Sequence, residues 1–510
     1  MNKSKELKIG AIIAYLTIAI NVISGILYTP WMIERIGDSD YGLYTLATSL
    51  INLFLFDFGL SAATSRFVAK YLAEGRQDKV DRILGTIYKL YFIIDAIICI
   101  ILIVISVFLE QIYTNLSPIE IQRLRVVFVI SAAFSVINFP CVTFTGILNA
   151  YEKFITLKSA DALYRIFSVL ITVVALLCNG GLYALVLVHV IVGLLVLLYK
   201  FYVIKAQTPV RVNFCNQEKG AFGDLLGFSM WITISSLFQR LIFGVTPSIL
   251  GIVSNTAAIA VFGIVSLMEN YIHIVTTALN GMFISRVSRI FNEHNYETKL
   301  NELIVKVARF QFALYGLIMI GFFLLGEDFV LLWLDESYSA VYYGLLLVTL
   351  PGLFFYPLQI ANTAMIMNNK VKFQAITNMI VGVLNVALAF VWSREYGVLG
   401  ACMAIFVAYN IRNIGYFVAY RRILKLNVKK LFLECYLPLG ACMLLTLIVG
   451  IGINYFWTEC NWLSLAIKVV VIVVVYFGLA FAVGMRQSEK KVLINTLLTV
   501  LRKRAPKDAE

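Results

Sequence analysis

The chain has too little charge and too few prolines for a soluble or a disordered protein of its length. Charged residues make up 14% of its 510 residues, whereas soluble domains carry about 25%. Hydrophobic residues make up 61%, and 9 prolines with 32 glycines are too few for a low-complexity chain. This much apolar surface does not fit into one water-soluble core, but a lipid bilayer solvates it. The composition therefore predicts a membrane protein.

Patterns typical of catalysis and metal binding are also missing. None of the 8 cysteines forms a CxxC pair or a cluster with histidine, so neither a zinc site nor a disulfide framework is indicated. The 3 histidines lack metal-ligand spacing, and no GxxxxGKS or GxxxxGKT loop is present to cradle phosphates. The net charge of +13 is spread over short clusters between apolar runs, which argues against nucleic acid as a partner.

Fourteen apolar stretches are long enough to cross a bilayer as α-helices, because a span needs roughly 20 mostly apolar residues. The spans are predicted at 9–29, 42–64, 87–109, 126–148, 159–178, 182–203, 223–246, 258–284, 305–326, 341–366, 374–393, 398–419, 434–457 and 463–484. Turn-rich or charged segments separate them, such as 179–181 and 393–397. The predicted fold class is an all-α polytopic membrane protein with 14 transmembrane helices.

The distribution of positive charge predicts the orientation of these spans. Lys and Arg gather in the cytoplasmic loops of membrane proteins. With the first residues inside, nearly all of the 42 Lys and Arg fall in alternate, cytoplasmic segments up to the last span. We therefore expect both termini in the cytoplasm. The outward loops are short and leave no room for an extracytoplasmic domain.

Two similar segments indicate an internal repeat. Residues 65–74 (SRFVAKYLAE) resemble residues 285–293 (SRVSRIFNE), and they end spans 2 and 8. Six spans separate the copies, so both cross the membrane in the same direction, as in a parallel repeat around a central site. The predicted domains are therefore an N-terminal lobe of spans 1–6 (1–210), a C-terminal lobe of spans 7–12 (211–425), spans 13–14 (426–485) and a cytoplasmic tail (486–510).

Polar and ionisable residues inside spans are candidates for binding, because uncompensated charge in hydrocarbon is costly. Arg240 lies in a polar stripe on one face of span 7, and Glu269 lies in a similar stripe of span 8. Spans 1 and 2 carry Asn21, Asn52 and Asp57. Two interpretations stay open. Arg240 and Glu269 either pair to hold the two spans together or line a hydrated cleft between the lobes, and one pair can do both.

Other polar residues in or beside spans have plainer explanations. His273, Asn378 and Asn385 are expected to make hydrogen bonds that hold helices together. Lys468 lies near the outer end of span 14 and is expected to extend its ammonium to the interface. Two arginines at the outer end of span 4, Arg123 and Arg125, depart from the charge rule. They are expected to meet lipid headgroups or the acidic residues Glu110 and Glu120.

Several short motifs resemble one family of membrane proteins. Residues 37–46 (GDSDYGLYTL) and 56–60 (FDFGL) resemble the G…YG.Y.L…DFGL signature of polysaccharide-export flippases. These flippases form a branch of the multidrug/oligosaccharidyl-lipid/polysaccharide exporter superfamily. Residues 331–335 (LLWLD) and 396–401 (YGVLGA) resemble two further stretches of the family, although Asp335 stands where glycine is common. The resemblance covers nearly the whole chain.

The resemblance implies a flippase rather than an enzyme. Its cargo would be a polyprenyl-diphosphate-linked oligosaccharide, such as an O-antigen unit of lipopolysaccharide, moved from the cytoplasmic to the outer leaflet of the bacterial inner membrane by alternating access through a central polar cavity. Membrane lipid and enzymes of glycan assembly are the implied partners, and no cofactor is implied. A multidrug-type cation antiporter of the same superfamily is the alternative, although an arginine inside a span favours anionic cargo. A glycan-polymerising membrane enzyme is a third alternative, disfavoured by the short outward loops.

The resemblance also implies roles for individual residues. The diphosphate would meet Arg240 inside the cavity, and the sugar would bind Asn21, Asn52, Gln239, Asn270 and Asn280. At the cytoplasmic entrance, the matching ends of spans 2 and 8 would capture the diphosphate with Arg66, Lys70, Arg286 and Arg289, whose plainer explanation is ordinary cytoplasmic charge. Asp57 and Glu269 would bind a driving proton or monovalent cation. The sequence does not decide between such coupling and facilitated diffusion.

Overall fold

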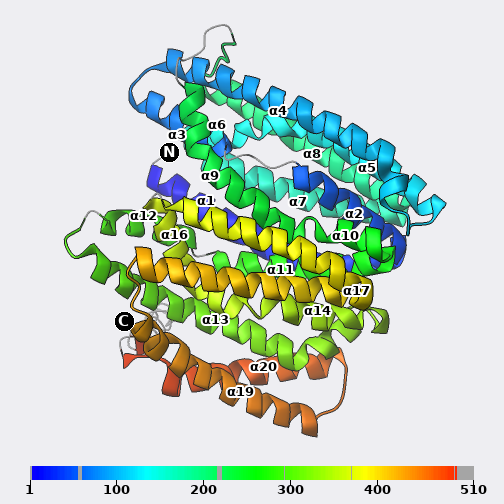
Figure 1. Ribbon diagram of the computed structural model, residues 1–510, viewed down its shortest axis with the longest axis vertical. Helices are drawn as coiled ribbons and strands as arrows, with labels where there is room; N and C mark the ends of the chain where they lie inside the picture. The colour runs from blue at the N-terminus through cyan, green and yellow to red at the C-terminus, as the bar shows by residue number, and fades with distance from the viewer. Residues whose placement is uncertain are drawn as a thin grey trace, which may run out of the picture. The chain divides into compact units, whose positions relative to one another are not determined.

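The computed structural model describes residues 3–54, 60–214, 221–278, 280–291, 293–368, 370–487 and 489–490. Within these residues every regular element is a helix, which confirms the all-α fold class (Figure 1). The helices up to the middle of the chain are α1 (Lys3–Ile36), α2 (Asp38–Phe54), α3 (Leu60–Ala73), α4 (Gln77–Ile112), α5 (Pro118–Cys141), α6 (Thr143–Ala150), α7 (Phe154–Leu177), α8 (Gly181–Gln207), α9 (Ala221–Phe243), α10 (Thr246–Val253) and α11 (Thr256–Thr277).

The remaining helices complete the chain in the same manner. They are α12 (Asn280–Ile290), α13 (Tyr296–Trp333), α14 (Ser339–Thr349), α15 (Gly352–Phe355), α16 (Gln359–Met367), α17 (Val371–Ile423), α18 (Val428–Leu431), α19 (Leu437–Phe456) and α20 (Trp462–Leu479). Short 3₁₀ turns occur at Glu336–Tyr338 and Tyr356–Leu358, and π-helical segments occur at Phe432–Tyr436 and Ala480–Gly484.

The chain packs as two compact units. The first unit comprises Met1–Val275 and Lys370–Arg412, and the second comprises Thr276–Asn369 and Asn413–Glu510. Helix α17 therefore contributes to both. The units are defined by packing, whereas the lobes 1–210 and 211–425 were inferred from sequence repetition. The division into lobes stays a prediction.

Twelve segments within the described residues are long and apolar enough to cross a membrane, so the protein is a multi-pass membrane protein. One of them is α17, whose 53 residues include a non-helical position at Gly397 with φ 55° and ψ −130°. This position separates the predicted spans 374–393 and 398–419. The predicted span 42–64 corresponds to α2 and α3. Residues 55–59, between these two helices, are outside the described residues. The total of fourteen is not confirmed and stays a prediction.

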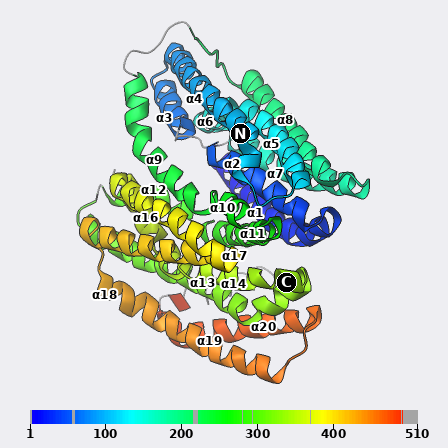
Figure 2. The ribbon, with the colours of Figure 1, turned by 45° about the vertical axis from the view of Figure 1, so that its right-hand side comes forward.

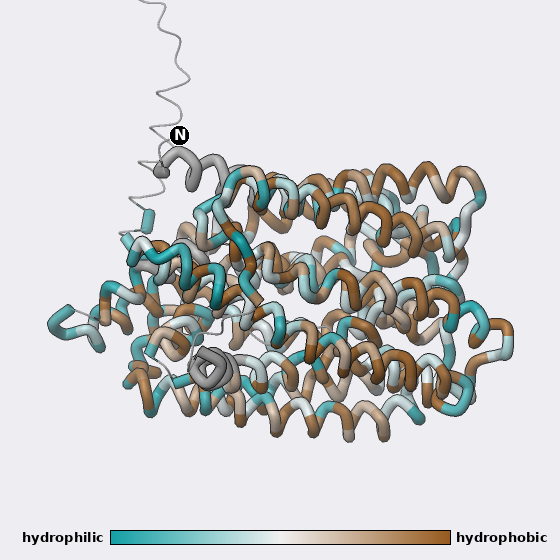
Figure 3. Tube along the Cα trace, turned by 90° about the horizontal axis from the view of Figure 1, so that it is seen from above, coloured by the Kyte–Doolittle hydropathy of each residue, from teal (hydrophilic) through white to brown (hydrophobic). Residues whose placement is uncertain are grey.

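The distribution of hydropathy along the helices fits a bilayer. Hydrophobic residues occupy the middle of the helices, and hydrophilic residues gather toward their ends (Figure 3). Many large apolar side chains are exposed along α4, α8 and α20. Exposed apolar surface on this scale is covered by lipid in a protein that spans a membrane.

Local sequence explains where helices begin and turn. Helix α5 begins with a capping box, in which Ser117 and Glu120 each accept a hydrogen bond from the backbone N–H of the other, and Pro118 follows the cap. Between α7 and α8 the chain turns through Asn179 (φ 61°) and Gly181 (φ 60°), at the predicted break. In the first unit, α4, α5 and α8 then lie side by side in both ribbon views (Figures 1 and 2).

The two arginines near the beginning of α5, its predicted outer end, both have carboxylate partners. Arg125 lies 2.8 Å from Glu110, which confirms one of the predicted pairings. Arg123 instead lies 2.8 Å from Asp40 at the start of α2. Ion pairs with acids of the same unit therefore explain why these two arginines occur in a predicted outward segment.

The second unit contains an ion pair between a buried lysine and a half-buried aspartate, which corrects the prediction for Lys468. The side chain of Lys468 is 2% exposed, and its Nζ lies 3.4 Å from the carboxylate of Asp328 on α13. The expected extension of Lys468 to the interface is wrong. A carboxylate on the neighbouring helix compensates the ammonium inside the protein, so the side chain has no need to reach water.

Helix α13 also carries a buried arginine. Arg309 is 4% exposed, and its Nε and Nη2 lie 2.7 Å from the two carboxylate oxygens of Glu489. Its guanidinium also donates to the backbone oxygens of Glu434 and Gly484. Both oxygens belong to π-helical segments, in which the wider turn displaces the ordinary backbone hydrogen bonds. Arg309 thus fastens the beginning of one terminal span and the end of the other to α13.

Candidate functional site

The site begins with the arginine on α9. Two asparagines of α17 hold this helix: Asn385 donates to the backbone oxygen of Ile242 at 3.2 Å, and Asn378 donates to the hydroxyl of Ser235 at 2.8 Å. These contacts confirm the predicted packing role of Asn378 and Asn385. They fix the part of α9 that carries Arg240, near the middle of the segment formed by α9 and α10.

Arg240 contacts α2 directly. Its Nη1 donates to the backbone oxygen of Asn52 at 2.7 Å, so the structure brings together two of the predicted site residues. The side chains of Asn52, Gln239 and Arg240 are nevertheless exposed, as is Asn270 on α11. Exposed polar groups in the middle of a span are not stable against hydrocarbon. We infer that water reaches this contact between α9 and α2.

A second arginine in the first unit escaped the sequence analysis. Arg165 lies in the middle of α7, and its Nη2 donates to the backbone oxygen of Asn21 at 3.2 Å. It also shares a hydrogen bond with the hydroxyl of Tyr271 on α11. Gly25 makes room for both groups, because a Cβ there would lie 1.7 Å from the Tyr271 hydroxyl and 3.2 Å from Arg165 Nη2.

Lys153 and Lys158 closely precede Arg165, so a charge count by segment places Arg165 with the predicted cytoplasmic residues before span 5. Its position well inside an apolar helix was the signal that could have separated it from them. Asn21, a predicted sugar ligand, contributes its backbone oxygen to this second cluster rather than to the contact at Arg240.

Aromatic side chains surround Arg165. Tyr44 stacks on His189 with ring centres 6.1 Å apart, and the Tyr164 hydroxyl lies 3.4 Å from His189 Nδ1. Tyr28, Tyr44 and Tyr164 are all close enough to Arg165 to interact with its charge. The cluster therefore combines a guanidinium with phenol hydroxyls and ring faces contributed by α1, α2, α7 and α8. Such groups bind phosphate oxygens, sugar hydroxyls and the apolar faces of sugar rings.

A third arginine of the first unit, Arg412, is the last residue of the part of α17 that belongs to this unit. Arg412 is 3% exposed, and its guanidinium carbon is 3.9 Å from the centre of the Tyr409 ring. Its charge acts on His273 of α11. The packing role predicted for His273 itself stays a prediction.

The other predicted residues fall in different places. Arg66 and Lys70 are exposed on α3, and Lys70 Nζ lies 5.7 Å from the centre of the Tyr71 ring. Glu269 is half-buried on α11. Asp57 lies outside the described residues.

Three predicted residues belong to the second unit. Asn280 accepts a hydrogen bond from the Gln311 amide, while Arg286 and Arg289 are exposed on α12. The pairing of Arg240 with Glu269 stays an open alternative.

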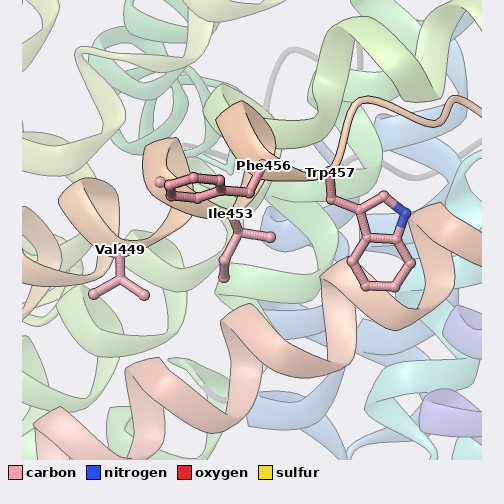
Figure 4. A pocket seen from close by; sticks show the side chains of 5 residues that line it. Val449, Ile453, Phe456 and Trp457 are labelled. Carbon is pink, nitrogen blue, oxygen red and sulfur yellow. The ribbon is translucent and has the colours of Figure 1, made fainter.

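A hollow beside α19 has a different character. Its lining consists of Val449, Gly452, Ile453, Phe456 and Trp457 (Figure 4). None of these five residues is ionisable, so the hollow offers no charge to a phosphate. The hollow belongs to the second unit.

Family comparison decides the classification. The family model described as polysaccharide biosynthesis protein matches residues 8–288, which is more than half of the chain. The chain belongs to this family. The matched residues include most of α1 and all of α2–α11, and with them Arg165 and Arg240, but not α17. Comparison with curated protein sequences gave no match.

Solved structures place this member of the family among known exporters by fold. The lipid II flippase MurJ in an inward closed conformation matches with a TM-score of 0.74 at 15% identity, over 92% of this chain and 98% of that chain. An inward-facing multidrug resistance MATE family transporter of the MOP superfamily matches with a TM-score of 0.67 at 13% identity, over 81% and 98%. A MOP superfamily transporter from Pyrococcus furiosus, described as having a binding pocket of reverse polarity, matches at 0.52 and 13%, over 83% and 95%.

The family match confirms the predicted polysaccharide family, and the solved structures confirm the predicted exporter fold. The proteins that share the fold are transporters and a flippase rather than enzymes. At identities this low the likeness shows the fold alone.

Proposed function

We propose that the chain is a flippase that moves a polyprenyl-diphosphate-linked oligosaccharide from the cytoplasmic to the outer leaflet. Its membership of the polysaccharide biosynthesis family and its exporter fold support this proposal. The observation that carries it is the exposed guanidinium of Arg240, anchored in the middle of a span against α2.

The chemistry of the cargo matches this placement. A diphosphate and a hydrated glycan are both costly to place in hydrocarbon, whereas the polyprenyl tail is stable there. Guanidinium groups bind phosphate oxygens through paired, charge-assisted hydrogen bonds. Arg240 therefore binds the diphosphate, with Arg165 as a second cation. The exposed amides of Asn52, Gln239 and Asn270 bind sugar hydroxyls.

The membrane in which the protein acts, its partner enzymes and the energy source of transport are further parts of this proposal. The charge pattern supports a bacterial inner membrane protein with both termini in the cytoplasm, serving enzymes that assemble the glycan. Asn21 and Asn280 remain proposed sugar ligands, and Arg66, Lys70, Arg286 and Arg289 the proposed entrance. Glu269 and Asp57 are the proposed carriers of a driving proton or monovalent cation.

The second candidate is a multidrug-type cation antiporter, because a MATE family transporter shares the fold. The arginines inside the spans of the first unit oppose it, since they repel a cationic cargo. Both candidates predict transport, and they differ in the sign of the transported charge.

Deletion of the gene tests the proposal directly. In the host cell we expect loss of the surface polysaccharide and accumulation of the lipid-linked glycan on the cytoplasmic leaflet. Sensitivity to cationic drugs should not change. Normal surface polysaccharide with increased drug sensitivity would reject the flippase in favour of the antiporter.

A further inference from the structure

One carboxylate joins three helices at the predicted outer end of the first unit. Glu120 lies in the first turn of α5. Its Oε1 accepts hydrogen bonds from the hydroxyls of Ser39 and Thr256, each at 2.8 Å. Its Oε2 accepts from the backbone N–H and the hydroxyl of Ser117, each at 2.9 Å. Both oxygens are therefore engaged, by partners from α2, from the start of α5 and from α11.

These bonds cross between the two predicted lobes. Ser39, Ser117 and Glu120 belong to the N-terminal lobe, whereas Thr256 belongs to the C-terminal lobe. A second bond crosses beside the first, because the side-chain amide of Asn115 donates to the backbone oxygen of Ile252. We call these two bonds, with the helix ends that they join, the outer seam.

The helices of the outer seam are in close contact. A Cβ added to Gly42 of α2 would lie 2.3 Å from the backbone oxygen of Thr256, and one added to Gly263 of α11 would lie 2.8 Å from the Thr45 hydroxyl. Glycine at each position lets α2 and α11 approach along two successive contacts. Leu46, beside these contacts on α2, is completely buried. The outer seam is thus closed to water in this structure.

We propose that Glu120 is the positioning residue of an outer gate, which its bond to Thr256 keeps closed. The inference rests on the proposed transport function and on the predicted orientation. A flippase must open toward the outer side to release its cargo, and the seam joins the two lobes at that side. Hydrogen bonds to a charged carboxylate are stronger than neutral ones and yet exchange readily with water once the seam opens. Loss of the Thr256 hydroxyl should therefore shift the gate toward its open state.

Thiol labelling tests the gate without any cargo. The reporter is Leu46→Cys, whose side chain faces Gly251 of α10 across the seam. The background carries Cys178→Ser and Cys460→Ser, because these two cysteines are exposed within the described residues. Intact cells are treated with a membrane-impermeant sulfonated thiol reagent, and labelling of the same background without the reporter is subtracted.

Adding Thr256→Val removes the hydroxyl and keeps the shape of the side chain. We expect reporter labelling on the order of tenfold faster than with the parent. Thr256→Ser keeps the donor and should restore the parent rate. Glu110→Gln, which removes an acid at the outer end of α4 that pairs within one lobe, should also leave the rate unchanged. Equal labelling with Thr256→Val and with the parent, or fast labelling with Thr256→Ser, would overturn the proposal.

A reversible cross-link provides the opposite test. The hydroxyls of Ser39 and Thr256 are bonded to the same carboxylate oxygen, so Ser39→Cys with Thr256→Cys should form a disulfide on oxidation. We expect cells that carry the oxidised double variant to stop displaying surface polysaccharide. The display should return after a reductant is added. Neither single variant should respond. Polysaccharide display by the cross-linked chain contradicts the gate. A chain that follows the labelling prediction but carries no glycan in any form refutes the proposed cargo and leaves the gate intact.

Discussion

The Nη1 atom of Arg240 lies 2.7 Å from the backbone oxygen of Asn52, and the contact joins helices whose residues are 188 positions apart in the chain. The carbonyl oxygen orients the guanidinium toward α2. Because the side chain is also exposed, this contact places a cation in a span where an anionic group can reach it.

Replacement of Arg240 by alanine should lower transfer of the lipid-linked glycan at least tenfold, because the phosphate loses a charge-assisted donor. Arg240→Lys should keep part of the activity, since it retains the charge without the paired donors. Surface polysaccharide per molecule of protein in the membrane is the measurement. Arg125→Ala, at an exposed ion pair of α5, is the control. Unchanged transfer by Arg240→Ala would remove this residue from the mechanism.

Gly25→Ala should displace the Tyr271 hydroxyl, which lies only 1.7 Å from the added methyl position. Overpacking of this kind costs about 1–3 kcal/mol, so we expect a lower thermal unfolding temperature in detergent. Gly440→Ala is the matched control, because nothing lies within 4 Å of its added Cβ.

The same pair of residues allows a coupling test. Tyr271→Ala removes both the hydroxyl and the ring carbon, which would lie 1.7 Å and 2.5 Å from the added Cβ, so Gly25→Ala should cost much less stability in that background. Additive losses in the double variant would show that the two residues do not meet.

Glu489→Ala should destabilise the second unit by about 3 kcal/mol, because it leaves the buried guanidinium of Arg309 without its carboxylate. Glu110→Ala breaks an exposed pair with Arg125 and should change stability by less than about 1 kcal/mol. Thermal unfolding of both variants in the same detergent gives the comparison. Similar unfolding temperatures for the two variants would be incompatible with a strong Arg309 pair.

The stabilisation by Glu489 should also depend on pH. Burial acts to raise the pKa of Glu489, but the hydrogen bonds and charge of Arg309 outweigh burial and hold the pKa below its usual value. A carboxyl whose pKa is lowered by folding stabilises the fold above its unfolded pKa and stops doing so as the pH falls through the folded value. The difference in unfolding temperature between the parent and Glu489→Gln should therefore be large at neutral pH and shrink in acid. A difference that grows in acid would show the opposite linkage.

The sequence was sufficient for the features that depend on local composition. Apolar runs located the helices, and the breaks near Asn179 and Gly397 coincide with positive φ angles. The pairing of Arg125 with Glu110 was also accessible, because only a short loop separates the two residues. In each case the interacting groups are neighbours in the chain, so composition and spacing contain the necessary information.

The sequence was insufficient where the partner is remote. Arg165 bonds Asn21 across 144 positions, and Arg309 pairs with Glu489 across 180. Both arginines lie close to lysines of the predicted cytoplasmic segments, so a charge count by segment places them at the flanks of their spans. Lys468 was misjudged for the same reason, because Asp328 lies 140 positions away. Only the packing of the helices brings these groups together.

The contacts of Arg309 have a consequence for biosynthesis. Its bonding partners at Glu434, Gly484 and Glu489 are translated 125 to 180 residues after it. While the chain emerges from the ribosome, α13 must enter the membrane with a guanidinium that none of these groups can yet satisfy. A guanidinium without its carboxylate is costly to bury, so we expect this end of α13 to stay hydrated until Glu489 arrives. Assembly of the second unit is therefore completed by its final segment, whatever order the earlier helices follow.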